Sequence, residues 1–179
     1  MISTIKETAE HFDAVRKLTI EAFSSSAFGH NGEAELIESV RQQCNDALSL
    51  VAIDREEVVG HILFSPATIR CKNKTHHGMG LGPIAVLPTH QRQGIGSMLV
   101  SHGMKQLALL EVEFTVVAGH PDFYPRFDFV PAANLAIVHG FEGMPQDILF
   151  IHTKESRPDF GEGRVYYHTA FGAQHVGAE

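Results

Sequence analysis

The residues best suited to chemistry lie in the stretch QRQGIGS, from Gln91 to Ser97, between an apolar run and a helical pattern. Gly94 and Gly96 stand where that helix begins, although glycine is a poor helix former. The start of a helix offers unpaired N–H groups and a partial positive charge, which together bind phosphate. The glycines leave the backbone open to a ligand, Arg92 adds a charge, and Ser97 adds a hydroxyl. The stretch therefore predicts a phosphate-binding loop.

Two common phosphate-binding loops do not fit this stretch. A Walker A loop ends in Gly-Lys-Ser/Thr, and no lysine follows Gly96. In a dinucleotide-binding fingerprint the third glycine would fall on Leu99, and a long polar loop separates the strand from the glycines. A second glycine cluster, residues 78–83, leads into a strand and so lacks a helix dipole. The loop must therefore serve a different kind of phosphate group.

Gln91, Gly94 and Gly96 fill the fixed positions of the signature Q/R-x-x-G-x-G/A, and the chain thereby resembles the GNAT superfamily of N-acetyltransferases. The preceding run LGPIAVLP is similar to the strand that leads into this loop in the family. The resemblance is strongest over residues 58–129 and weaker on either side.

A second segment with the same resemblance is GHPDFYPRFDF, residues 119–129. It is similar to the family's F-Y-x-x-x-G-F segment, and more closely to the YhbS-like subgroup of predicted acetyltransferases. Asp128 occupies the usual glycine position. Because aspartate also tolerates turn conformations, this departure concerns the local turn more than the chemistry.

The resemblance implies an α+β fold whose mixed, mostly antiparallel, twisted sheet is flanked by helices. In the family, strands four and five (here GPIAVL and FTVVAG) splay apart to admit acyl-CoA. It also implies acetyl-CoA as acyl-donor co-substrate and no metal. The residues expected to bind it are Ile84, Ala85 and Val86 through their backbone, and Gln91, Arg92, Gln93, Gly94, Ile95, Gly96 and Ser97 at the loop and helix start.

The implied reaction is direct attack of an amine on the acetyl carbonyl in a ternary complex. It requires a deprotonated amine, donors for the developing oxyanion and a proton for the departing thiolate. The family's tyrosine donor maps onto Tyr124. The alternative is that Tyr124 is an aromatic side chain packed beside Phe123 and Phe127.

The residues that would contact the acceptor are less specific. His120 titrates in a useful range, but it precedes a proline and also suits a turn. Glu33, together with Glu35, could face an amine, and a solvated helix face explains both equally well. A water relay would need no single base, so the base stays unassigned.

The twelve histidines raise the question of a metal site. His76 and His77 are adjacent, so on a strand they point to opposite faces. His61, His90 and His102 have no matching carboxylate or cysteine pattern. We therefore predict no metal.

The elements that must position these residues can be read from the hydrophobic pattern. Helical spacing is expected in the N-terminal third, interrupted by SSSAFGHNG, and again after Gly96, where Gly103 would let the helix lie close to a sheet. A hairpin turn is expected at DREE, and a short helix around Phe123. The expected strands are residues 48–54, 58–71, 81–87, 113–119, 133–140, 147–154 and 163–171.

Composition limits the class of protein. The 179 residues fit one domain over 1–179 with a motif core at about 58–129, and the 44% hydrophobic and 20% charged residues are typical of a globular protein. A net charge of -7 argues against nucleic-acid or anionic-membrane binding and suits a cationic partner. The two cysteines and the absence of an apolar leader or long apolar run indicate a cytoplasmic protein. A homodimer is the first assembly to consider.

Together these observations predict an acetyl-CoA-dependent N-acetyltransferase acting on a primary amine of a small molecule or peptide. The alternatives are a catalytically silent acyl-CoA sensor domain, and an acyltransferase that uses another acyl-CoA or a hydroxyl acceptor. The choice of acceptor is expected to depend on the N-terminal helices and the C-terminal strands.

Overall fold

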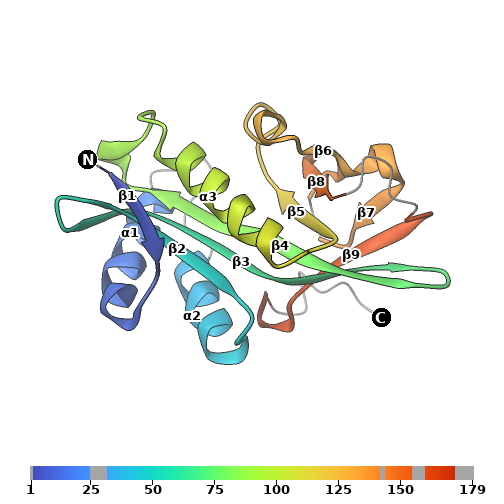
Figure 1. Ribbon diagram of the computed structural model, residues 1–179, viewed down its shortest axis with the longest axis horizontal. Helices are drawn as coiled ribbons and strands as arrows, with labels where there is room; N and C mark the ends of the chain where they lie inside the picture. Colours follow the sequence, from blue (N-terminus) through green and yellow to red (C-terminus); the bar gives the residue numbers. More distant parts are fainter. Residues whose placement is uncertain (1, 25–31, 142–143, 155–159, 172–179) are drawn as a thin grey trace. The chain divides into compact units, whose positions relative to one another are not determined.

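The computed structural model describes residues 2–24, 32–141, 144–154 and 160–171. Contacts divide the chain into two compact units, and each unit is made of two separate segments of the sequence. The first comprises Met1–Phe64 and Gly82–Gln106, and the second comprises Ser65–Leu81 and Leu107–Glu179. Two long strands, β3 (Glu57–Cys71) and β4 (Thr75–Val86), contribute to both units (Figure 1).

The first unit is an antiparallel sheet with helices on its two faces. Strand β1 (Ser3–Lys6) pairs with β2 (Leu48–Asp54), which pairs with β3. Side chains alternate along β3, so Gly60 contacts the helix α3 (Ile95–Leu109), whereas His61 faces the helix α2 (Glu33–Gln43). The helix α1 (Phe12–Ser24) packs beside α2 (Figure 1).

The second unit is a mixed sheet. Strand β5 (Phe114–Ala118) runs parallel to β4 and antiparallel to β8 (Leu149–Thr153), which also pairs with β6 (Val130–Pro131). Strand β9 (Gly163–Tyr167) pairs antiparallel with β3 and parallel with β7 (Ile137–His139). The short 3-10 helices here are η3 (Tyr124–Phe127), η4 (Ala132–Leu135), η5 (Gln146–Ile148) and η6 (Thr169–Phe171).

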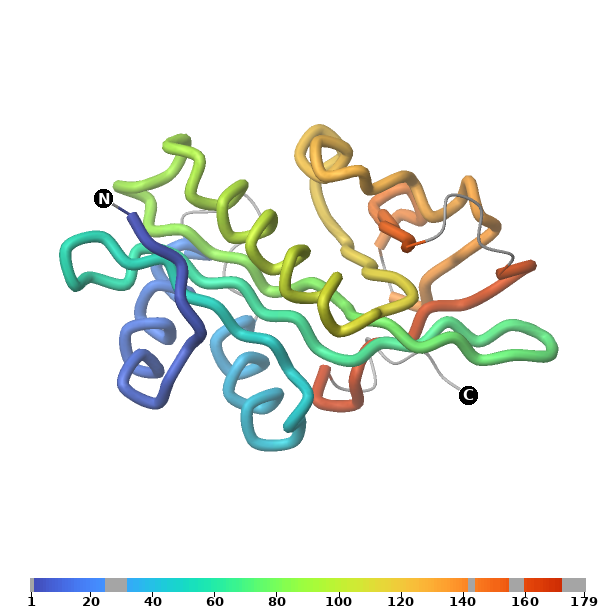
Figure 2. Tube along the Cα trace, in the orientation of Figure 1, coloured from blue at the N-terminus to red at the C-terminus, as the bar shows by residue number. Residues whose placement is uncertain are grey.

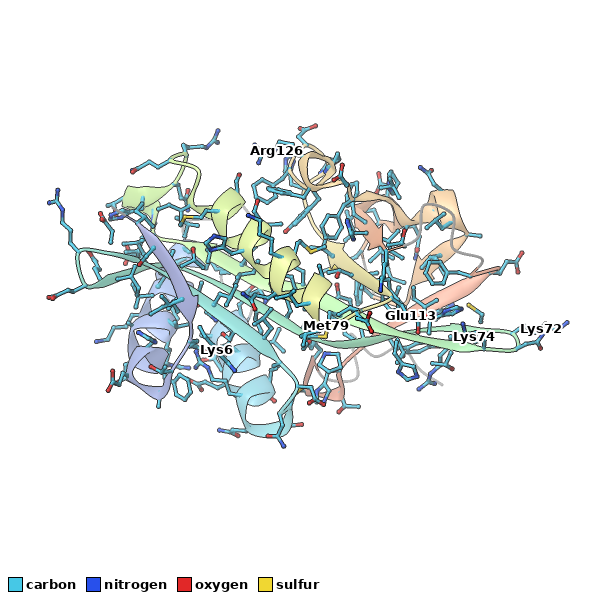
Figure 3. All side chains as sticks on the ribbon, viewed as in Figure 1. Lys6, Lys72, Lys74, Met79, Glu113 and Arg126 are labelled. Carbon is cyan, nitrogen blue, oxygen red and sulfur yellow. The ribbon has the colours of Figure 1, made fainter. Side chains whose placement is uncertain are left out.

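The parallel register between β4 and β5 joins Met79, Gly80 and Leu81 to Thr115–Val117. It ends two residues before Pro83, which has no N–H to donate. At the other end of this unit, β3 and β4 meet in a hairpin closed by the Cys71 N–H and the Lys74 carbonyl, 2.9 Å apart (Figures 2 and 3).

Most expected elements are present, and the predicted fold class is confirmed. The DREE hairpin turn is found, with positive φ at both Arg55 and Glu56, as in a type I′ turn. Gly103 also has the expected role, since an added Cβ would lie 2.3 Å from the Phe64 ring. The SSSAFGHNG interruption lies mostly outside the described residues.

Three expectations about elements were wrong. Ser3–Lys6 precedes the first helix and is a strand, too short to show a period, that gains its hydrogen bonds from β2. The first half of 133–140 is the end of η4, and Ala136 at φ 55° turns the chain into β7. The strand expected at 81–87 begins earlier, at Thr75, so the whole glycine cluster 78–83 lies inside β4. Its Gly78 and Gly80 leave room for the neighbouring rings of Phe114 and Tyr167.

Cys44 and Cys71 are thiols, not half-cystines. Among the helices of the described residues, none has the length and apolar character needed to cross a membrane.

Candidate active site

Helix α3 begins directly after the two-glycine loop. The Gly94 carbonyl accepts the first helical hydrogen bond, from the Met98 N–H at 3.0 Å. The N–H groups of Ile95, Gly96 and Ser97 therefore have no acceptor within the helix. The first turn of α3 contains no acidic residue, so no carboxylate offsets the positive end of the helix dipole. This arrangement is one that binds phosphate groups.

The backbone of the loop explains its first glycine. Gly94 has φ 84°, in the left-handed region that glycine adopts without steric cost, and a Cβ there would meet open space. Arg92 is also left-handed, at φ 61°. The loop thus makes a sharp reversal between the 3-10 turn η2 (Pro88–His90) and α3. Gly94 is required by the turn and also leaves the surface open.

Two glutamine side chains hold the loop in shape. The Gln91 amide donates to the Val86 carbonyl at 3.1 Å, and the Gln93 amide donates to the Thr89 carbonyl at 3.2 Å. Both side chains thus bond to backbone near the loop itself. Gln91, the glutamine of the signature, thus links the loop to the end of β4.

Packing within the first unit fixes the start of α3. Ile95 is 2% exposed and Leu99 is fully buried. Both approach Gly60 of β3, where an added Cβ would lie 3.0 Å from each side chain. The unpaired N–H groups are therefore presented by a helix whose first turn is anchored to the sheet.

The end of β4 lies in the same unit as the loop. Ala85 is 4% exposed and points into the core, whereas Ile84 and Val86 point to the opposite face and are partly exposed. After the strand, the Leu87 N–H donates to the Val59 carbonyl at 3.0 Å. The structure thus brings together the expected cofactor residues of β4 and of the loop.

Tyr124 lies in the second unit, at the start of η3, and is 5% exposed. Its ring packs over Gly119, where an added Cβ would lie 2.3 Å from the Tyr124 ring and 3.2 Å from its hydroxyl oxygen. The rings of Phe123, Phe129 and Phe150 surround it, with centroids 5.1, 5.8 and 6.3 Å away. Within the described residues its hydroxyl has no hydrogen-bond partner, so it can donate to a ligand.

Burial raises the pKa of Tyr124 above the usual value of 10 for a phenol. The group therefore stays protonated at neutral pH. Nearby, the guanidinium of Arg126 lies 4.6 Å from the centre of the Phe123 ring, on the outer side of the turn (Figure 3). Tyr124 is thus a packed aromatic residue that keeps its phenol proton, and its role as the donor stays a prediction.

The position at which the family usually has glycine, Asp128, is left-handed, with φ 62° and ψ 19°. The turn keeps the geometry that glycine favours, and aspartate tolerates it. The departure noted in the sequence therefore leaves the turn intact.

His120 is an exposed turn residue in the structure. Its Nδ1 accepts a hydrogen bond from the Asp122 N–H at 3.3 Å and lies 3.8 Å from the Asp122 carboxylate. The turn role explains its position, and a role in substrate binding stays a prediction.

Glu33 is the first residue of α2, where a carboxylate is favoured by the helix dipole. Glu35 and Glu38 of the same helix pair with Arg16 of α1, at 2.8 and 2.7 Å. These contacts give Glu35 a structural role, and the predicted acceptor role of Glu33 stays a prediction.

The histidines considered for a metal have other neighbours. His61 contacts Ser49 at 2.8 Å, and His76 contacts Glu113 at 2.9 Å (Glu113 is labelled in Figure 3). No group of three or more histidine, cysteine, aspartate or glutamate side chains in the described ranges is placed to hold a metal ion.

The sequence profile of the acetyltransferase (GNAT) domain matches residues 5–132, which include both the glycine loop and Tyr124. This chain belongs to the GNAT acetyltransferase family. The resemblance inferred from Gln91, Gly94 and Gly96 is thereby confirmed.

Two relatives from Escherichia coli (strain K12) are described as uncharacterized N-acetyltransferases. YjhQ is 36% identical over 117 residues, which cover 64% of this chain and 65% of YjhQ, just under two thirds of its length. YhbS is 32% identical over 116 residues, which cover 64% of this chain and 68% of YhbS.

Two solved structures share the fold. A GNAT family acetyltransferase from Brucella melitensis, in complex with acetyl-CoA, has a TM-score of 0.79 and 30% identity, covering 96% of this chain and 98% of that one. YhbS from Escherichia coli, in complex with CoA, has a TM-score of 0.82 and 25% identity, covering 99% of this chain and 96% of YhbS.

Sequence reasoning missed two glycines that make room for buried tyrosines in this GNAT protein. Gly119 makes room for the Tyr124 ring, and its place directly after a strand was the available signal. Gly80 makes room for Tyr167, which contacts β5 through its hydroxyl. Nothing in the sequence links these last two residues.

Proposed function

We propose that this GNAT protein transfers the acetyl group of acetyl-CoA to a primary amine of a small molecule or peptide. The observation that carries the proposal is the start of α3, where three unpaired N–H groups follow an exposed, left-handed Gly94 and no acid offsets them. The complexes of the Brucella melitensis protein with acetyl-CoA and of YhbS with CoA support the same ligand.

Each part of the cofactor has residues suited to it. The pyrophosphate would accept hydrogen bonds from the N–H groups of Ile95, Gly96 and Ser97, with Arg92 supplying charge. The pantetheine amides would pair with the backbone of Ile84–Val86, in the manner of an added strand. Gln91 and Gln93 would shape the loop, since their amides already bond to its backbone.

The chemical step needs no metal. The lone pair of a neutral amine attacks the acetyl carbonyl carbon, and the electrons of the C–S bond leave with sulfur as the thiolate of CoA. The nitrogen loses one proton, to water or to a base, and the product is an amide. The atoms and charges then balance with the thiolate of CoA, the acetylated amine and one proton, which together give free CoA.

Tyr124 would assist the leaving sulfur as a hydrogen-bond donor. Its pKa is raised by burial, whereas an ordinary thiol has a pKa of about 8.5. Complete proton transfer from this phenol to a thiolate is therefore uphill, and donation of a hydrogen bond to the developing negative charge is the favoured contribution.

Calorimetric titration with acetyl-CoA tests the binding site. Gly94→Ala forces a side chain into the left-handed region of the loop and should weaken acetyl-CoA binding roughly tenfold. Gly161→Ala is the matched control, because Gly161 also has positive φ, at 59°, and open space around it. Equal affinities in the two variants would count against the α3 site.

A transfer assay tests the reaction. Thiol release from acetyl-CoA should depend on an added primary amine and should be absent with the matching hydroxyl compounds. Release with hydroxyl compounds would favour the alternative acceptor, and release only from another acyl-CoA would favour a different donor. Tight acetyl-CoA binding with no release across the panel would favour a sensor domain.

A further inference from the structure

Near its end, strand β5 accepts a hydrogen bond from a tyrosine side chain that has no role in the proposed reaction. On one edge of β5, the Gly119 N–H donates to the Ile148 carbonyl at 3.0 Å, and the Glu113 carbonyl accepts from the Lys154 N–H at 3.3 Å. The odd-numbered residues of β5 therefore bond toward β8. Because backbone groups alternate along a strand, Val116 and Ala118 direct theirs to the opposite edge, where β4 pairs.

The hydroxyl of Tyr167 reaches one of these backbone groups. Tyr167, at the end of β9, is 6% exposed, and its hydroxyl donates to the Val116 carbonyl at 3.3 Å. Burial raises the pKa of Tyr167, so the phenol keeps the proton that it donates. The hydroxyl thus holds a backbone carbonyl on the β4 side of β5.

The neighbours of Tyr167 fix its ring in this position. The ring lies over Gly80 of β4, where an added Cβ would be 2.3 Å from it. Phe141 and Phe171 pack on the ring, with centroids 5.5 and 5.0 Å away. The hydroxyl is therefore held at the ladder by packing as well as by its hydrogen bond.

The end of β5 leads directly to the candidate donor. Gly119 follows Ala118, and the Tyr124 ring rests on Gly119. A shift of the Ala118–Gly119 backbone would therefore move the Tyr124 hydroxyl.

We propose that Tyr167 is a positioning residue: its hydroxyl clamps the Val116 carbonyl near the end of β5 and thereby sets the position of the Tyr124 hydroxyl. The inference rests on the proposed function, in which Tyr124 assists the leaving thiolate. Tyr167 itself does not contact the reacting atoms.

Tyr167→Phe removes the hydroxyl and keeps the packed ring. We expect kcat to fall about three- to tenfold, because one long hydrogen bond is lost, while the KM for acetyl-CoA changes less than twofold. Tyr166→Phe is the matched control, because the Tyr166 ring stacks instead with the guanidinium of Arg70, at 4.4 Å. That variant should retain the wild-type kcat.

A double-mutant cycle separates positioning from a general structural effect. If Tyr167 acts through Tyr124, adding Tyr167→Phe to Tyr124→Phe should cost no further activity. Equal losses in the presence and absence of the Tyr124 hydroxyl would overturn the inference, as would an unchanged kcat in Tyr167→Phe.

Amide hydrogen exchange gives a readout that does not depend on activity. The Val117 amide belongs to the same peptide group as the Val116 carbonyl and should exchange several-fold faster in Tyr167→Phe than in the wild type or in Tyr166→Phe. Unchanged exchange at Val117 would show that the clamp is absent. If the wild type transfers no acetyl group, the proposed function fails, and the exchange measurement still decides whether the clamp exists.

Discussion

Asp128 is held in a conformation that most residues avoid. Its φ of 62° is left-handed, which costs a residue with a Cβ roughly 1 kcal/mol relative to glycine. We expect Asp128→Gly to match or exceed the stability of the wild type and Asp128→Ala to lose roughly 1 kcal/mol relative to Asp128→Gly. Urea unfolding followed by circular dichroism measures both. Equal stability of the alanine and glycine variants would contradict a left-handed turn.

In the proposed reaction, Tyr124 is the residue that donates a hydrogen bond to the leaving thiolate. Tyr124→Phe removes the only group we assign to the leaving thiolate, so kcat should fall at least tenfold while the KM for acetyl-CoA stays within twofold. Steady-state kinetics with Tyr166→Phe as control measure the effect. A kcat equal to that of the wild type would remove Tyr124 from the mechanism.

The buried phenol also predicts a pH dependence. Burial disfavours the phenolate and raises the pKa of Tyr124, so its donor proton is kept at pH values where an ordinary tyrosine, with a pKa of 10, would begin to lose it. The ratio of wild-type to Tyr124→Phe kcat should therefore stay constant up to pH 10. A ratio that falls between pH 9 and 10 would show an unperturbed phenol.

At the scale of the element, α3 depends on a close approach to β3. An added Cβ at Gly103 would lie 2.3 Å from the ring of Phe64, which is fully buried. Gly103→Ala should destabilise the protein by roughly 1–3 kcal/mol, although alanine favours a helix by about 1 kcal/mol. His102→Ala, on the exposed side of α3, is the control for helix propensity.

A second variant shows whether the ring is the cause. Gly103→Ala combined with Phe64→Leu should lose less stability than the sum of the two single variants, since leucine makes room for the new methyl group. Strictly additive losses in thermal unfolding would mean that Gly103 and Phe64 do not share this contact.

At the scale of the whole molecule, stability depends on a buried polar cluster in the first unit. The Ser49 hydroxyl donates to Glu7 at 2.8 Å and contacts Nε2 of His61 at 2.8 Å, so the His61 proton lies on Nε2. Arg41 bonds to Glu7 from α2. His61 Nδ1 is buried and has no partner among the described residues. Protonation of His61 would therefore place a hydrogen on Nδ1 that is buried without an acceptor.

This cluster predicts a loss of stability in acid. Burial and the charge of Arg41 lower the pKa of His61 to about 3, from 6.5 when exposed. Between these values the unfolded chain binds a proton that the folded chain does not, so stability falls as the pH drops from about 6.5 toward 3. Near pH 5, the slope for this group alone is about 1.4 kcal/mol per pH unit. His61→Gln should flatten the pH dependence of urea unfolding, and an unchanged slope would contradict it.

Local features made much of this molecule predictable. A left-handed Gly94 before a helix and an aromatic turn after a strand leave short signatures, so the loop, the short helix near Phe123 and the fold class could be inferred from the sequence. The roles assigned to the site residues stay predictions. Contacts between distant segments leave no such signature. The pairing of β1 with β2, the Arg16–Glu35 ion pair and the contact of Tyr167 with Gly80 and β5 depend on the folded chain.

The most direct test of the account is the fate of a carbonyl-labelled acetyl group. The wild type would be incubated with labelled acetyl-CoA and a panel of primary amines, and the products followed by NMR and mass spectrometry. The account predicts a labelled amide on an amine, formed in step with free CoA and reduced at least tenfold in Tyr124→Phe. Labelled acetate alone, or no product from any amine despite bound acetyl-CoA, would contradict it.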